Sequence, residues 1–203
     1  MTTGGSGGGE KPPSSRANLP RTLTRCPECL LLRALCMCGE ITPMPTRTRI
    51  VILRHIGEQF RSSNTGRIAA KALLGAEIVD HGNGRGPPPE LASAGTWLAW
   101  PEGPLAHVAP VPSPKRLVFL DATWHQARRM RRSLPSLRGL PVLALPIAHV
   151  PAARLRASPG RGRVSTIEAI ALALRLVEGE APAAELERLF AIMIDRARGA
   201  GRR

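Results

Sequence analysis

Aromatic residues are nearly absent from the chain: among 203 residues there are three Phe, three Trp and no Tyr. Leu, Ile, Val and Ala must therefore fill the core, and a hydrophobic content of 43% is sufficient for one, which excludes an intrinsically disordered chain. No run of about 18 apolar residues occurs, so we expect no membrane-spanning helix. The first residues also lack the apolar run of a secretory signal peptide, so we expect a cytoplasmic protein.

Acidic residues are scarce, because 15 Asp and Glu stand against 29 Lys and Arg, for a formal net charge of +14. This imbalance predicts a polyanionic partner, and nucleic acid is the favoured one. Two segments carry arginines with no acid among them: Arg128, Arg129, Arg131 and Arg132 in one, and Arg161 and Arg163 within the loop 146–164 in the other. A loop as long as 146–164 is usually functional or disordered. Because both segments carry arginines without acidic residues, we expect both to contact phosphate groups.

Only four cysteines occur, and all lie within thirteen residues: Cys26, Cys29, Cys36 and Cys38. Such a cluster is typical of a metal site in a reducing cytoplasm rather than of a disulfide framework. Four thiolates at this spacing are suited to a closed, tetrahedral structural zinc site. An iron–sulfur cluster is the alternative metal centre, and unligated buried cysteines are the alternative without metal.

Short apolar runs alternate with segments of helical spacing, which predicts an α/β fold with a mainly parallel sheet and helices on both faces. The expected strands span 46–54, 77–80, 96–100, 117–120 with Asp121 at its end, and 140–145. The expected helices span 68–74, a segment that begins near 124, 166–177 and a packing helix around 186–194. The Gly-rich loop 82–86 is followed by three prolines, which excludes the helix that a dinucleotide-binding fingerprint needs.

The most informative stretch runs from Arg116 to Met130, where a short strand ends in Asp121 and a helical segment follows. In open α/β sheets, ligands bind beyond the carboxyl ends of the strands. Asp121 is itself a residue that caps helices. However, Thr123 and Gln126 have the spacing of a capping box, which leaves Asp121 free just upstream. We therefore expect Asp121 to stand at the mouth of a basic surface.

Polar residues begin two further helices. Ser63 or Asn64 is placed to cap the first, whereas the same helix start together with Arg67 is also suited to holding a phosphate or a carboxylate. Ser165 and Glu168 have both the types and the spacing of a capping box. Spacing alone does not choose between a structural and a binding role at the first helix start. At the second, the capping box is a strong structural explanation on its own.

Four features, in the same order, resemble the DTW-domain family. They are the four-cysteine cluster, the segment Ser63-Asn64-Thr65-Gly66-Arg67, the segment Asp121-Ala122-Thr123-Trp124 and the segment Ser165-Thr166-Ile167-Glu168-Ala169. Together they span residues 26–169, most of the chain. One segment departs from the family pattern, because Ile56 and Gly57 replace a His-Pro step before Glu58, whereas His55 and Glu58 remain.

The resemblance implies a SPOUT-like fold, with the option of a trefoil knot, and a tRNA-uridine aminocarboxypropyltransferase. Such an enzyme moves the 3-amino-3-carboxypropyl group of S-adenosylmethionine to N3 of a uridine, here in the tRNA variable loop, and leaves methylthioadenosine. Asp121 is then either the base that takes the N3 proton or the group that binds the donor's ammonium. Trp124 either stacks on a base or packs in the core. The alternatives are a SPOUT-type RNA methyltransferase and a non-enzymatic, zinc-dependent RNA-binding protein.

The expected site residues form four further groups beside the cysteines. They are catalytic Asp121, Thr123 and Trp124; donor-binding Asn64, Thr65, Leu120, Ser165, Thr166 and Glu168; RNA-binding Arg67 with the six arginines named above; and second-tier His55 and Glu58. The expected organisation is a disordered tail (1–20), a zinc-binding segment (21–45), the catalytic domain (46–198) and a basic tail (199–203). Either a monomer or a homodimer is compatible with the sequence.

Overall fold

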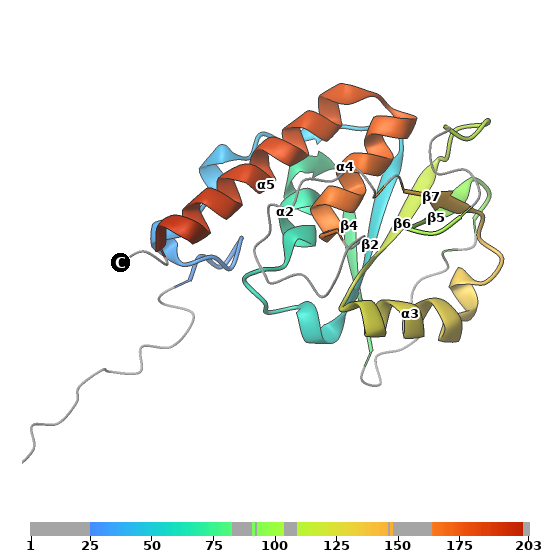
Figure 1. Cartoon of the computed structure of the whole chain (residues 1–203), viewed down its shortest axis with the longest axis horizontal. Helices are drawn as coiled ribbons and strands as arrows, with labels where there is room; N and C mark the ends of the chain where they lie inside the picture. Colours follow the sequence, from blue (N-terminus) through green and yellow to red (C-terminus); the bar gives the residue numbers. More distant parts are fainter. Residues whose placement is uncertain are drawn as a thin grey trace, which may run out of the picture.

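The computed structural model describes residues 25–82, 91, 93–103, 109–145, 147 and 164–200. In this part of the chain, five strands form one parallel sheet in the order β4-β2-β6-β5-β7. Helices α2, α4 and α5 cover one face of the sheet and α3 covers the other (Figure 1). The α/β architecture expected from the sequence is therefore confirmed.

The bounds of the elements follow the sequence pattern closely. The sheet comprises β2 (Arg49–His55), β4 (Glu77–His81), β5 (Thr96–Trp100), β6 (Arg116–Asp121) and β7 (Val142–Ala144). The helices are α2 (Thr65–Ala72), α3 (Trp124–Ser133), α4 (Thr166–Val177) and α5 (Glu180–Ala200). Short 3-10 helices are η1 (Arg33–Leu35), η2 (Cys38–Glu40), η3 (Ile56–Glu58) and η4 (Pro135–Leu137), and a two-stranded pair joins β1 (Met44–Pro45) to β3 (Leu73–Leu74).

The central strands are apolar throughout because both of their faces are buried. In β2, Ile50 and Ile52 belong to the core beneath α2, α4 and α5, whereas Val51 and Leu53 belong to the core beneath α3. The same alternation in β6 directs Phe119, and with it Asp121, toward the α2 and α4 side. The acidic residue therefore lies in line with a row of core residues.

Strands β2 and β6 are neighbours, yet the helices that follow them pack on opposite faces of the sheet. Helix α2 follows β2 and contributes Ile68 to one core, and α3 follows β6 and contributes Met130 to the other. A crevice opens at the carboxyl ends of two strands whose connections diverge in this way, and ligands bind there in open α/β sheets. Asp121 is the last residue of β6 and lies at this switch point.

Several boundaries differ from the sequence-based expectation, as in β7, which is shorter than the expected strand 140–145. In two elements a specific contact accounts for the difference. The helix expected at 68–74 begins at Thr65 and ends at Ala72, because Leu73 and Leu74 pair with Met44 and Pro45. Leu has high helix propensity, but pairing with a distant segment overrides this local preference. The strand expected from residue 46 begins at Arg49, because the side chain of Thr46 bonds the carbonyl oxygen of Thr48 (2.9 Å) in a bend.

No helix in the described ranges is both long and apolar enough to cross a lipid bilayer. Tracing a knot requires the route of the chain from β7 to α4, and residues 148–163 of that route lie outside the described residues. The knot therefore remains an expectation. Helix α5 runs to Ala200, two residues into the segment expected to be a tail.

Candidate functional site

Asp121 is the point at which the separate parts of the site meet. The residue is buried, with 5% exposed, and its carboxylate accepts a hydrogen bond at each oxygen. The Nδ2 group of Asn64 donates to one oxygen (2.5 Å), and the hydroxyl of Thr166 donates to the other (2.7 Å). The expectation that Asp121 is free of helix capping is thus confirmed. The expectation that it stands at the mouth of a basic surface is wrong, because two helix starts cover it.

Both hydrogen-bond donors stand at the first turn of a helix. Asn64 caps α2 by accepting from the backbone N–H of Arg67 (3.0 Å), while its amide nitrogen bonds Asp121. Thr166 is the first residue of α4, and the backbone N–H of its neighbour Ile167 donates to the hydroxyl of Thr65 (3.3 Å). The negative charge of Asp121 therefore lies between two positive helix ends, an arrangement that stabilises a carboxylate.

Gly66 makes this close approach possible. A Cβ atom at this position would lie 2.9 Å from Oδ2 of Asp121 and 3.3 Å from a side-chain carbon of Ile52. The first distance is shorter than real Cβ atoms tolerate and the second is tight, so a larger residue requires Asp121 or α2 to move. The glycine of the Ser-Asn-Thr-Gly-Arg segment is needed for space, next to the carboxylate.

A second set of charges continues from Asp121 across the sheet. Arg54 of β2 is the register partner of both Asp121 and Asp80. Its guanidinium binds Asp80 at two points (2.7 and 3.1 Å), with 8% and 17% of the two side chains exposed. Arg67 of α2 lies close enough to Arg54 for the two positive charges to interact. The pKa of Arg67 is lowered, mainly by its burial and secondly by the positive charge of Arg54. The carboxyl edge of the sheet thus holds two acids and two arginines in close proximity.

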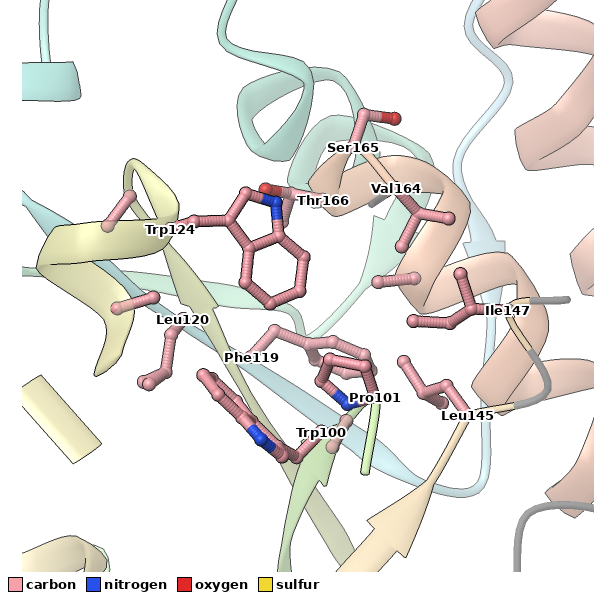
Figure 2. Close-up of a pocket in the computed structure, with 14 residues that line it drawn as sticks. Trp100, Pro101, Phe119, Leu120, Trp124, Leu145, Ile147, Val164, Ser165 and Thr166 are labelled. Carbon is pink, nitrogen blue, oxygen red and sulfur yellow. The ribbon is translucent and has the colours of Figure 1, made fainter. Parts of the chain in front are cut away.

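A pocket opens on the other side of Asp121, at the carboxyl ends of β5, β6 and β7 (Figure 2). Its walls are mainly apolar, and the start of α4 closes one side. The lining residues are Ala99, Trp100, Pro101, Phe119, Leu120, Ala122, Trp124, Ala127, Leu145, Ile147, Val164, Ser165, Thr166 and Ala169. Asp121 lies directly behind this wall, between Leu120 and Ala122 and bonded to Thr166.

The tryptophans form one side of this pocket, opposite Leu145 and Ile147 (Figure 2). The rings of Trp100 and Trp124 meet edge to face, with centroids 5.9 Å apart and an interplanar angle of 66°. The guanidinium of Arg131 lies 4.8 Å from the centroid of the Trp100 ring, which is cation–π geometry. Trp124, half-buried at the first position of α3, is therefore held on one side and faces the pocket with the rest of its ring.

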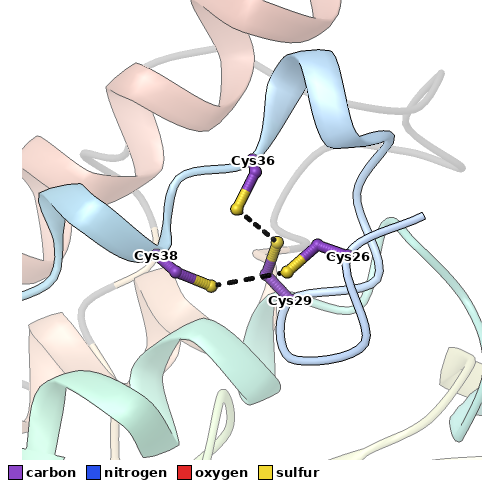
Figure 3. Close-up of side chains that lie close together, drawn as sticks. All are labelled: Cys26, Cys29, Cys36 and Cys38. Carbon is purple, nitrogen blue, oxygen red and sulfur yellow. Dashed lines mark hydrogen bonds between the residues drawn. The ribbon is translucent and has the colours of Figure 1, made fainter. Parts of the chain in front are cut away.

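The four cysteines converge as the sequence predicts (Figure 3). Their sulfur atoms lie within 4.8 Å of one another, and two pairs, Cys26 with Cys38 and Cys29 with Cys36, are 3.8 and 3.9 Å apart. A tetrahedral site with zinc–sulfur bonds of about 2.3 Å requires sulfur atoms about 3.8 Å apart. The arrangement thus fits a four-thiolate zinc site. A hydrogen bond from the backbone of Cys29 is the main cause that lowers the pKa of Cys26 to about 6.

The cysteine segment is built into the body of the protein. Cys29 and Met37 are buried in the core that α2, α4 and α5 share. Arg196 of α5 donates to the carbonyl oxygen of Cys36 and pairs with Glu40 (2.5 Å). Any ion held by the cysteines therefore also fixes the surface on which α5 packs.

A model of the DTW domain matches residues 23–198. The chain belongs to the DTW domain family. It is also 29% identical over 175 residues to tRNA-uridine aminocarboxypropyltransferase 2 of Drosophila melanogaster, a match that covers 80% of this chain and 70% of that relative. No solved structure matches the chain.

The residues expected to bind the donor lie in two layers. Leu120, Ser165 and Thr166 line the pocket. Asn64 and Thr65 lie behind them, buried against Asp121 and α4. Glu168 completes the capping box with Ser165 and accepts from its backbone N–H (2.7 Å).

The remaining expected residues of the DTW domain are dispersed. The side chain of Thr123 is used in the capping box of α3 with Gln126. His55 caps η3 by accepting from the N–H of Gly57 (3.0 Å), and the buried Glu58 pairs with Arg61 (3.2 Å).

The arginines divide into three groups. Arg128, Arg129 and Arg132 are exposed along α3, and Arg131 is half-buried against Trp100. Arg67 lies apart from them, near Asp121. Residues 161 and 163 lie outside the described residues.

The sequence did not indicate three residues that the structure places at or beside the site: Arg54, Asp80 and Gly66. Arg54 and Asp80 lie near the ends of β2 and β4, and the sequence does not show that these two strands are neighbours. Their opposite charges at the ends of two strands are the feature that could have suggested an ion pair. Gly66 lies within a segment that resembles the family, but its role depends on a contact with a residue 55 positions away.

Proposed function

We propose that this DTW-domain protein transfers the 3-amino-3-carboxypropyl group of S-adenosylmethionine to N3 of a uridine in tRNA. The observation that carries the proposal is that three of the segments that resemble the family meet at Asp121, through its hydrogen bonds with Asn64 and Thr166. They meet beside an apolar pocket at the carboxyl edge of a parallel sheet. The relative from Drosophila melanogaster, named as a tRNA-uridine aminocarboxypropyltransferase, supports the same reaction. Methylthioadenosine is the second product.

The pocket has the composition that the donor requires. Its apolar wall of Leu145, Ile147 and Val164 suits an adenosine moiety. The start of α4, with Ser165 and Thr166, offers polar groups at the opposite wall. We infer that the adenosine part binds among the apolar residues and that the amino acid part points toward Thr166 and Asp121.

Asp121 orients the donor in this proposal. Its carboxylate already accepts two hydrogen bonds, which fix its direction, and it is nearly inaccessible to solvent. A fixed negative charge behind the pocket wall attracts the donor's ammonium group and so determines which carbon faces the uridine. Correct orientation of two reactants can supply a large part of a rate enhancement, so orienting the donor would accelerate the transfer. Proton abstraction from N3 by Asp121 is the competing role.

Gly66→Ala tests this geometry. The added methyl group collides with Asp121, so we expect turnover to fall by about 10- to 100-fold, because displacements near 1 Å have that effect. Stability should fall by about 1–3 kcal/mol, as overpacking does. Gly199→Ala in α5, where nothing lies within 4 Å, is the matched control. Steady-state rates and urea unfolding check both, and wild-type turnover in Gly66→Ala would mean that the position of Asp121 is unimportant.

The exposed arginines of α3 form the proposed tRNA-binding surface. Replacing Arg128, Arg129 and Arg132 together by Gln should weaken tRNA binding and reduce the slope of log affinity against log salt by about 0.7–0.9 for each phosphate group that is no longer neutralised. Donor affinity should be unchanged, because these side chains are absent from the pocket lining. Filter binding at several salt concentrations measures the slope.

The matched control is the removal of Arg33 and Arg198, which are also exposed but lie on other elements. An unchanged slope in the α3 variant would place the RNA elsewhere.

The four cysteines would hold a structural zinc ion. The ion would close the segment 25–45, which has little regular structure of its own, and join it to α5 through the contacts of Arg196. Thiolate ligands stay reduced in a cytoplasm, where we place the protein.

The test of the proposed function uses the purified protein, an unmodified tRNA transcript and two samples of S-adenosylmethionine. One sample is labelled in the carboxypropyl chain and the other in the methyl group. Label from the carboxypropyl chain should enter the tRNA, and label from the methyl group should remain in methylthioadenosine. Methyl label in the tRNA would instead establish a methyltransferase, and no transfer with intact tRNA binding would favour a non-enzymatic RNA-binding protein.

A further inference from the structure

Phe60 is an aromatic residue that the fold leaves in solvent. Its relative exposure is 80%, whereas the other five aromatic residues are buried or half-buried. Single exposed apolar residues are common on protein surfaces, so exposure alone has no functional meaning. Its position in the fold is what distinguishes Phe60.

Phe60 lies in a loop that hydrogen bonds hold rigid. The loop connects η3 to α2, and its backbone turns are closed by N–H groups of Gln59, Arg61 and Asn64, with bonds of 3.1, 3.2 and 3.1 Å. The guanidinium of Arg67 reaches back from α2 to the carbonyl oxygens of Gln59 and Arg61. These bonds hold both neighbours of Phe60 in place, and its ring stands out from the loop into solvent.

This loop borders the proposed active site on two sides. At one end Asn64 donates directly to Asp121. At the other end His55, which precedes the loop, lies 3.2 Å from the side chain of Gln126 in the first turn of α3. Figure 1 shows η3 beside the start of α3 at the same edge of the sheet. The loop that carries Phe60 is therefore tied at one end to the carboxylate and at the other to the first turn of α3, the helix that bears Trp124.

The loop around Phe60 presents no negative charge to an RNA strand. Its one acid, Glu58, is buried and paired with the half-exposed Arg61. The exposed arginines of α3 begin four residues after Trp124. Proteins stack the bases of single-stranded nucleic acid on aromatic rings while basic side chains bind its phosphates. The exposed arginines of α3, whose first turn contacts His55, would supply the basic side chains here.

We propose that Phe60 is a stacking platform for a nucleobase next to the target uridine of the RNA substrate. A uridine must leave its stack to reach the pocket beside Trp124, and the neighbouring base then loses a stacking partner. Phe60 replaces that partner and so keeps the opened strand at the site. This inference rests on the proposed function and adds a residue that positions the RNA.

The test compares Phe60→Ala, Phe60→Leu and Phe60→Trp in the full-length protein. Because Phe60 is mostly exposed, all three should fold like the wild type. Phe60→Ala should bind unmodified tRNA about 10-fold more weakly, within the range measured for removal of a base-stacking ring, with the same salt slope as the wild type. Phe60→Leu should resemble the alanine variant, and Phe60→Trp should restore binding. Leu74→Ala, in β3 of the separate two-stranded pair and 55% exposed, is the matched control and should have no effect.

Wild-type tRNA affinity in Phe60→Ala would overturn the proposal, as would full binding by Phe60→Leu, since leucine has no π face. Transfer activity of the wild-type protein is measured in the same samples, so the two proposals fail separately. Transfer with normal binding by Phe60→Ala refutes the stacking role alone. Weakened binding by Phe60→Ala in a protein that transfers nothing refutes the aminocarboxypropyl reaction and leaves the stacking role intact.

Discussion

Asp121→Asn should reduce turnover by about 100-fold or more while the protein stays folded and binds tRNA normally. The asparagine has the same shape, so its carbonyl oxygen can accept from Asn64 and its amide group can donate to the hydroxyl of Thr166. Both hydrogen bonds persist in altered form, and only the negative charge between the two helix starts is removed. In the proposed orienting role, affinity for S-adenosylmethionine falls together with turnover.

The same variant distinguishes the two roles of the carboxylate. If Asp121 instead removes the N3 proton, donor affinity stays near the wild-type value while turnover falls. Thr166→Val is an informative second variant, because it removes one hydrogen bond to Asp121 and keeps the charge. Asp195→Asn, an exposed change on α5, controls for the removal of one negative charge. Wild-type turnover by Asp121→Asn would show that the residue is structural.

Cys36→Ser should lower the free energy of unfolding by about 4 kcal/mol or more, the scale expected for the loss of a structural metal. Cys36 is only half-buried, and serine has nearly the same shape, so the substitution costs little by packing alone. A large effect therefore reports the loss of a metal ligand. Loss of the ion also loosens the segment that holds Arg196, so α5 should exchange its amide hydrogens faster.

Metal analysis and urea unfolding measure this effect. The wild type should contain one zinc ion per chain, and a chelator should reproduce the instability of Cys36→Ser. Arg33→Ala, in the adjacent η1 and exposed, should leave both metal content and stability unchanged. A wild type purified without bound metal, or one whose stability a chelator leaves unchanged, would show that the cluster binds no structural ion.

Local features of the fold were predictable from the sequence. The capping boxes of Thr123 with Gln126 and of Ser165 with Glu168 form as expected, because each depends on residues three positions apart. Asn64 caps α2 for the same reason. The strands were recognisable because burial on both faces demands continuous apolar runs.

Contacts between distant segments were not predictable in this way. The ion pair of Arg54 with Asp80 and the pairing of β1 with β3 join residues more than 25 positions apart, and no local pattern encodes them. The burial of Asp121 belongs to the same class. Its place after a strand was apparent, but the two helix starts that cover it come from segments 57 residues before and 45 residues after it.

Nucleoside mass spectrometry of tRNA is the most direct test of the central claim. Unmodified tRNA is incubated with S-adenosylmethionine and either the wild-type protein or Asp121→Asn, and then digested to nucleosides. The wild type should produce a uridine heavier by one aminocarboxypropyl group, with an equal amount of methylthioadenosine, and Asp121→Asn should produce almost none. A uridine heavier by a methyl group, or no modified uridine despite tight binding of tRNA and donor, would contradict the proposed function.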